Sequence, residues 1–183
     1  MSSKEFKVIG FIGLGVMGCS MSKNLLKNKN WNVLVKDLDV NKEKELENHG
    51  AKVADDVKDI FKLSDLVITC LPGGNFVEDL YFGKSNNISN IKKNQFIVDM
   101  STSQPDLMIR LEDEIKTKGS HFADAPIART RQAAIDGTLA IMVGSTTNVY
   151  NKILPTLKYM GNDIMHCGLS LIHISEPTRP SKI

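Results

Sequence analysis

The feature that most constrains the fold is a glycine-rich turn that directly follows a short apolar run near the amino terminus. The run KVIGFI spans residues 7–12, and the turn GLGVMG occupies residues 13–18. From about Val16 to Lys29, apolar residues recur at helical spacing, which predicts a helix. A strand that passes through a tight glycine turn into a helix is the first half of a strand–helix–strand unit with parallel strands.

The rest of the chain repeats this alternation of short apolar runs and longer helical patterns. Further strands are expected at residues 32–36, 51–54, 66–71, 95–100, 121–124, 139–143 and 163–167, and further helices at 41–48, 55–62, 104–118 and 147–160. The run LVITCL at 66–71 is almost continuously apolar, as in a strand buried on both faces. The pattern predicts one α/β domain with a doubly wound, mostly parallel sheet of the Rossmann type.

Composition excludes several classes of protein. The 183 residues are 42% hydrophobic and 24% charged, with a formal net charge of +2, too small for a nucleic-acid-binding surface. No apolar run reaches the ~18 residues of a membrane span. Cys19, Cys70 and Cys167 show neither metal-ligand nor disulfide spacing. We expect a soluble cytoplasmic protein without a metal site and with neither nucleic acid nor a membrane as its partner.

The glycine turn has the G-x-G-x-x-G spacing of a dinucleotide-binding site. Gly13 allows the tight turn, Gly15 lets a pyrophosphate approach the backbone, and Gly18 allows the helix to pack closely on the strand. The N–H groups at the start of the helix and its dipole favour phosphate. A tight turn without a ligand is the alternative.

A carboxylate after the second strand supports the nucleotide interpretation. Asp37 lies nineteen residues beyond Gly18, where an acidic residue can accept hydrogen bonds from an adenosine ribose. Leu38 follows it, in place of an arginine that would favour a 2′-phosphate, so NAD is expected rather than NADP. Asp39 could take the same role, and a helix N-cap is the alternative for either aspartate.

Two further segments follow strands and should lie at the same edge of the sheet. Leu71 and Pro72 could pack on the cofactor, and Thr102, after Ser101, could form a hydrogen bond near the nicotinamide. A helix N-cap in this serine- and threonine-containing segment is an equally good interpretation and is compatible with ligand contact.

Four motifs in order, GFIGLGVMGCSMSKNLL, ITCLPGG, IVDMSTSQP and DAPIARTRQAAIDGTLAIMVG, resemble those of the β-hydroxyacid dehydrogenases. This family includes 3-hydroxyisobutyrate dehydrogenase, tartronate semialdehyde reductase and relatives of 6-phosphogluconate dehydrogenase. The resemblance implies reversible hydride transfer between a nicotinamide cofactor and a small β-hydroxyacid or its semialdehyde. It implies cofactor contacts from the glycine turn and beyond, at Leu14, Val16, Met17, Asp37, Leu71, Pro72 and Thr102.

The resemblance also implies that the segment Ala128, Arg129 and Thr130 binds the acid group of the substrate. Most members have Ser-Gly-Gly there, and an arginine resembles a branch that reduces small acidic aldehydes, including sulfolactaldehyde reductase. A guanidinium binds carboxylate, sulfonate or phosphate through a bidentate fork. Arg129 is therefore the predicted anion-binding residue, with a surface arginine as the alternative, and Arg131 is expected in solvent or on a helix.

The resemblance implies a catalytic lysine on a helix after the dinucleotide-binding domain, and we expect this sequence to lack its counterpart. We expect residues 1–168 to form this domain and 169–183 to be a tail foreign to the family, in which neither His173 nor Lys182 replaces the lysine. We also expect no counterpart of the all-helical second domain, which completes the pocket and usually the dimer in relatives. Three interpretations remain: a truncated, inactive dehydrogenase, a non-catalytic nucleotide-binding module, or a fragment of a 6-phosphogluconate dehydrogenase-like enzyme.

Overall fold

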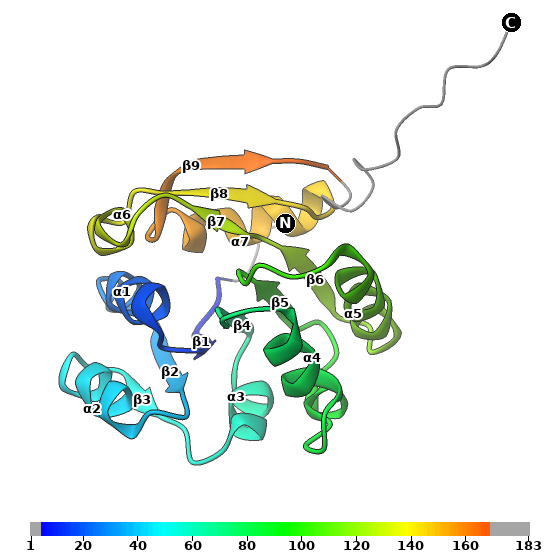
Figure 1. Ribbon diagram of the computed structural model, residues 1–183, viewed down its shortest axis with the longest axis horizontal. Helices are drawn as coiled ribbons and strands as arrows, with labels where there is room; N and C mark the ends of the chain where they lie inside the picture. Colours follow the sequence, from blue (N-terminus) through cyan, green and yellow to red (C-terminus); the bar gives the residue numbers. More distant parts are fainter. Residues whose placement is uncertain (1–4, 169–183) are drawn as a thin grey trace, which may run out of the picture.

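A parallel sheet of six strands forms the centre of the protein, in a computed structural model that describes residues 5–168 (Figure 1). The strands are β1 (Val8–Ile12), β2 (Asn32–Lys36), β3 (Lys52–Val53), β4 (Leu66–Thr69), β5 (Phe96–Asp99) and β6 (His121–Asp124). Their order is β3-β2-β1-β4-β5-β6, and all neighbours run parallel. The chain moves outward from β1 in both directions, so the order reverses between β1 and β4. Ligands bind at such a switch point, beyond the carboxyl ends of the strands.

Helices cover both faces of this sheet. They are α1 (Val16–Leu25), α2 (Val40–Asn48), α3 (Val57–Leu63), α4 (Gly74–Phe82), α5 (Pro105–Thr117) and α7 (Thr147–Leu157), with a 3-10 turn at Asn87–Asn90. Alternate residues of the strands enter two separate cores: Phe11 and Ile68 join the core of α1 and α7, whereas Ile12 and Val67 join that of α3, α4 and α5. The predicted doubly wound α/β fold is confirmed.

The last third of the chain differs from the prediction, because it forms a second sheet. Strands β7 (Ile127–Ala128), β8 (Leu139–Val143) and β9 (Gly161–His166), with helix α6 (Arg131–Asp136), lie along the top of the view in Figure 1. β8 pairs antiparallel with β7 and parallel with β9. Two backbone bonds between Asp124 and Gly144, of 3.1 and 2.8 Å, link the end of β6 to the residue after β8. Two residues further on, Pro126 has no N–H to donate, but its carbonyl accepts from the N–H of Met142 at 3.1 Å and continues the pairing into β7.

Several element bounds also differ from the sequence prediction. α1 ends at Leu25, four residues before the predicted Lys29, since Leu25 is the last of its fully buried apolar residues. The pattern did not indicate α4, α6 or β7. The predicted tail at 169–183, with His173 and Lys182, lies outside the described residues. Within residues 5–168, no helix has both the length and the apolar content needed to cross a membrane.

Candidate functional site

The glycine turn joins the end of β1 to the start of α1, and its three glycines differ in their surroundings. Gly13 has φ +94°, and a Cβ there would lie 2.3 Å from the carbonyl oxygen of Cys70. A Cβ at Gly18 would lie 2.0 Å from the carbonyl oxygen of Gly13, but a Cβ at Gly15 would meet no atom within 4 Å. Gly13 and Gly18 are therefore required by packing within the protein. Gly15 leaves the first turn of α1 open for an anion.

Asp37 lies beside this turn, at the end of β2. Its Oδ2 accepts a hydrogen bond from the N–H of Leu14 at 2.5 Å, and its Oδ1 accepts one from the N–H of Asp39 at 2.8 Å. Asp39 itself caps α2, accepting from the N–H of Asn41 at 3.0 Å. The N-cap interpretation thus holds for Asp39, whereas Asp37 ties the end of β2 to the glycine turn.

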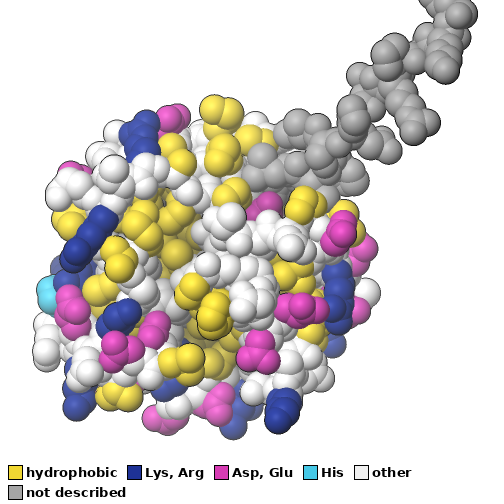
Figure 2. All heavy atoms as spheres, in the orientation of Figure 1, with side chains coloured by type: hydrophobic (Ala, Val, Ile, Leu, Met, Phe, Trp, Pro, Cys, Tyr) yellow, Lys and Arg dark blue, Asp and Glu magenta, His cyan; other side chains and the backbone are white. Residues whose placement is uncertain are grey.

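A cleft of about 630 Å³ opens at this edge of the sheet. Most of the predicted cofactor-binding residues line it, namely Gly13, Gly15, Val16, Met17, Gly18, Asp37, Leu71 and Pro72. Leu14 is fully buried beneath the turn, and Thr102 is exposed without lining the cleft. Hydrophobic side chains are grouped around the middle of the face shown in Figure 2. The cleft is mainly apolar, and polar groups of the glycine turn and Asp37 lie along it.

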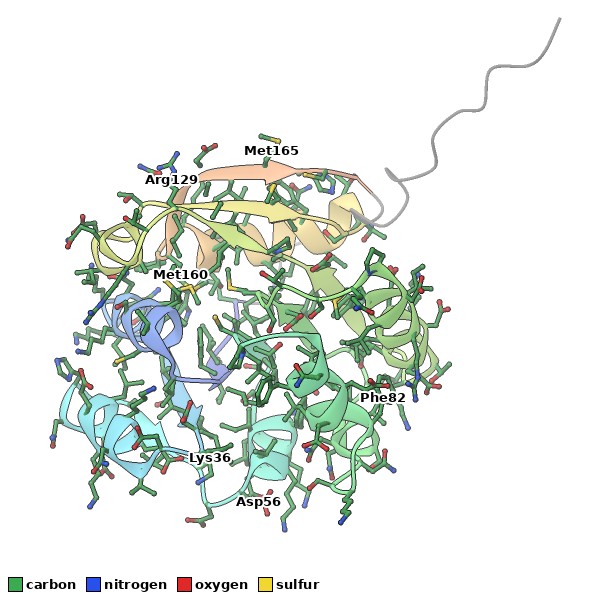
Figure 3. The ribbon with its side chains drawn as sticks, in the orientation of Figure 1. Lys36, Asp56, Phe82, Arg129, Met160 and Met165 are labelled. Atoms are coloured by element: carbon green, nitrogen blue, oxygen red, sulfur yellow. The ribbon has the colours of Figure 1, made fainter. Side chains whose placement is uncertain are left out.

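The sequence analysis missed other residues of the cleft. Lys36 comes from the end of β2 and Lys42 from α2, and Phe76 and Leu80 come from α4. Figure 3 labels two residues of the cleft lining, Lys36 and Asp56. Phe76 and Leu80 could have been found only by recognising α4 after Gly73-Gly74, where the glycines masked the helical spacing.

A buried polar cluster lies behind the cleft, at the ends of β4 and β5. Oδ1 of Asp99 accepts hydrogen bonds from the hydroxyls of Thr69 at 2.6 Å and Ser101 at 2.7 Å. Ser101 Oγ in turn accepts from the N–H of Leu71 at 2.9 Å. Burial raises the pKa of Asp99, although both hydroxyl bonds oppose the rise. The interpretation of this segment as an N-cap is wrong, because Gln104 takes the cap position of α5, without a side-chain bond.

Burial also raises the pKa values of two neighbours of Asp99. It raises the pKa of Asp124, on the adjacent strand, to about 7, with the charge of Asp99 as the second cause. It also raises the pKa of the Cys70 thiol to about 12, so this cleft residue is a neutral thiol and a poor nucleophile.

The predicted substrate segment lies on the second sheet, away from the cleft lining. Arg129 has φ +90° and donates hydrogen bonds to the carbonyl of Thr138 at 2.8 Å and to the side chain of Asn162 at 3.2 Å. It also forms an ion pair of 2.9 Å with Asp163. Figure 3 shows Arg129 at the top of the view and Lys36 near the bottom. In this conformation the guanidinium is bound within the protein.

The flanking residues of that segment have simpler surroundings. Ala128 is exposed at the end of β7, and Thr130 caps α6 by accepting from the N–H of Ala133 at 3.4 Å. The structure therefore gathers most of the predicted cofactor-binding residues in one cleft but does not bring the predicted substrate segment into its lining.

Comparison with known proteins identifies relatives of this domain. A 3-hydroxyisobutyrate dehydrogenase of Drosophila melanogaster is 37% identical over 163 residues, which are 89% of this chain and 49% of that protein. The 2-(hydroxymethyl)glutarate dehydrogenase of Eubacterium barkeri is 36% identical over 160 residues, 87% of this chain and 53% of that protein. The chain spans about half the length of the curated relatives it matches.

Solved structures with a similar fold include a dehydrogenase of the same group. A Mycobacterium tuberculosis 3-hydroxyisobutyrate dehydrogenase, solved with L-serine, superposes with a TM-score of 0.82 at 28% identity, covering 88% of this chain and 54% of that one. The family described as the NAD binding domain of 6-phosphogluconate dehydrogenase matches residues 8–168. The match covers the glycine turn, Asp37 and both loops of the cleft. The chain therefore belongs to the family of the NAD-binding domain of 6-phosphogluconate dehydrogenase, as its four sequence motifs predict.

Proposed function

We propose that the cleft binds NAD in preference to NADP. The observation that carries this proposal is the pair Asp37 and Leu38 at the end of β2. Asp37 lines the cleft and presents a carboxylate to the position of an adenosine ribose, which can donate its hydroxyls. A 2′-phosphate at that position would be repelled by the carboxylate. Leu38, at 98% exposure, offers it no charge.

Two lysines of the cleft could favour NADP, because a cationic side chain attracts the 2′-phosphate. Lys36 is held in an ion pair of 3.0 Å with the buried Glu43, which neutralises it. Lys42 also lies on the cleft and could approach a phosphate. A single lysine on a flexible stem is a weaker phosphate ligand than a bidentate arginine. The carboxylate of Asp37 therefore dominates, and NAD remains the preferred cofactor.

The whole protein, in this proposal, transfers a hydride between NAD and a small β-hydroxyacid or its semialdehyde. The dehydrogenase names of relatives more than 30% identical to this chain support this activity. The bound cofactor would supply or accept the hydride. The residues of this chain would hold its pyrophosphate at α1 and its ribose at Asp37.

The acid group of the substrate is proposed to bind at Ala128, Arg129 and Thr130. Arg129 would exchange Asp163 for the substrate anion. An exposed ion pair of this kind contributes about 0–1 kcal/mol, so the exchange costs little. Replacing Arg129 with alanine in the whole enzyme should raise KM strongly for an anionic substrate. An unchanged KM would remove Arg129 from the substrate site.

The cofactor proposal is tested by titrating this chain with NADH and with NADPH, following nucleotide fluorescence. We expect saturable binding of NADH with a Kd at least tenfold below that of NADPH. Equal or tighter binding of NADPH would refute the preference, and the absence of saturable binding of either nucleotide would refute the site. Turnover is measured separately in the whole protein with a panel of small semialdehydes.

A further inference from the structure

We propose that Ser101 positions the wall of the cofactor cleft by holding the loop that follows β4. This inference rests on the proposed function, since it concerns affinity for NADH. Leu71 and Pro72, the wall residues, come from that loop and line the cleft. Ser101 is 2% exposed and belongs to the next loop of the sheet, after β5.

The backbone bonds of the sheet end just where the wall begins. The N–H of Cys70 donates to the carbonyl of Ile12 at 2.9 Å, which continues the pairing of β4 with β1. The N–H of Leu71 has no such strand partner and donates to Ser101 Oγ. Pro72 has no N–H at all. Among the residues that the structure describes, the bond from Leu71 to Ser101 is therefore the last hydrogen bond that an N–H of this loop donates before Pro72.

A hydrogen bond to the buried Asp99 fixes the orientation of the Ser101 side chain. Its hydroxyl has one proton, which it donates to Oδ1 of the fully buried Asp99 at 2.7 Å. With that proton committed, an oxygen lone pair is directed to the N–H of Leu71. The chain of bonds from Asp99 through Ser101 to Leu71 joins the loops after β5 and β4.

The position of Leu71 matters because its side chain packs against the glycine turn. A Cβ built on Gly13 would lie 2.9 Å from Cδ2 of Leu71 and 2.3 Å from the carbonyl oxygen of Cys70. A displacement of the loop would change the width of the cleft beside the turn. The loop must therefore be held in one position for the cofactor to contact both walls.

Thr69 provides a matched control within the same cluster. Its hydroxyl donates to the same Oδ1 of Asp99, at 2.6 Å, and it is fully buried like Ser101. It forms no bond to Leu71. Thr69→Val and Ser101→Ala each remove one hydroxyl bond to Asp99, but only the second also releases the loop.

The test measures NADH affinity and the thermal midpoint of wild type, S101A and T69V. We expect both variants to lower the midpoint, S101A to raise the Kd for NADH about five- to tenfold, and T69V to leave the Kd within twofold. An unchanged Kd in folded S101A would overturn the inference, as would an equal loss of affinity in T69V. Failure of the wild type to bind NADH would refute the proposed function instead.

Two conservative variants keep the test decisive if S101A does not fold. Ser101→Cys nearly preserves the size of the side chain but replaces the oxygen with a weak sulfur acceptor, so it should raise the Kd in the same direction. Asp99→Asn retains an oxygen that can accept from both hydroxyls and should keep the wild-type Kd even at a lower thermal midpoint. Wild-type affinity in S101C, or an affinity loss in D99N that matches S101C, would count against positioning by Ser101.

Discussion

Replacing Gly15 with alanine should abolish most of the cofactor affinity without harming the fold. The structure leaves open space at this position, because a Cβ meets no atom within 4 Å, and φ is −57°, outside the left-handed region that disfavours alanine. The substitution also reduces the freedom of the unfolded chain. It should therefore change the free energy of unfolding by about 0 to +1 kcal/mol, in the stabilising direction.

The same open space is where we propose that the pyrophosphate lies. A methyl group there holds the phosphates away from the N–H groups at the start of α1. Each hydrogen bond to a charged group contributes about 1.5–3 kcal/mol. Losing one of them raises the Kd for NADH roughly 10- to 150-fold.

The assay pairs NADH titration with thermal unfolding, and Gly18→Ala is the control. Its Cβ would lie 2.0 Å from the carbonyl oxygen of Gly13, an overpacking that costs about 1–3 kcal/mol of stability or more. G15A should thus lose affinity and keep stability, whereas G18A should lose stability first. Wild-type affinity in G15A would refute the placement of the pyrophosphate at this turn.

Three further predictions follow from other parts of the structure. Leu38→Arg should tighten NADPH binding about tenfold without changing the thermal midpoint, because Leu38 is 98% exposed; unchanged NADPH affinity would contradict the assignment of the ribose position. The pKa of Asp124 is about 7 in the folded protein against 3.8 ordinarily, so the folded state binds more protons and stability should fall as pH rises from 4 to 7. Asp124→Asn should reduce this pH-dependent loss of stability by at most roughly 4 kcal/mol, measured by urea unfolding at several pH values. Some pH dependence should remain, because burial also raises the pKa of Asp99. Asp163→Asn frees Arg129 from its ion pair and should lower KM for an anionic substrate of the whole enzyme while costing about 0–1 kcal/mol of stability; a higher KM would show that the pair itself is needed.

The sequence predicts the central sheet well because its signals are local. Each strand is a short apolar run, and the turn at residues 13–18 combines glycine spacing with a preceding strand, so neighbours along the chain carry the information. Asp37 was predicted for the same reason, at a fixed distance from Gly18. The structure confirms the strands and brings these residues to one cleft.

The second sheet could not be predicted, because its pairing depends on contacts between distant residues. Strands were expected near β8 and β9, but β7 has only two residues and gives no strand pattern. Nothing along the chain indicated that these strands pair with one another apart from the central sheet. The roles of Ser101 and Asp99 were missed for a related reason. A serine after a strand predicts an N-cap equally well, and only the spatial proximity of Leu71 shows that it bonds elsewhere.

The connection between the two sheets has a consequence for amide hydrogen exchange. Asp124 and Gly144 are joined by two backbone hydrogen bonds. The side-chain amide of Asn24, in α1, donates a hydrogen bond to the backbone carbonyl of Ala134, in α6, at 2.8 Å. Asn24 is almost fully buried, so opening α6 would leave its amide without a partner in an apolar interior. The helix beneath the glycine turn and the helix beyond Arg129 should therefore open as a single cooperative unit. Bound nucleotide should then slow exchange in α6 as well as in α1, although α6 lies outside the cleft lining.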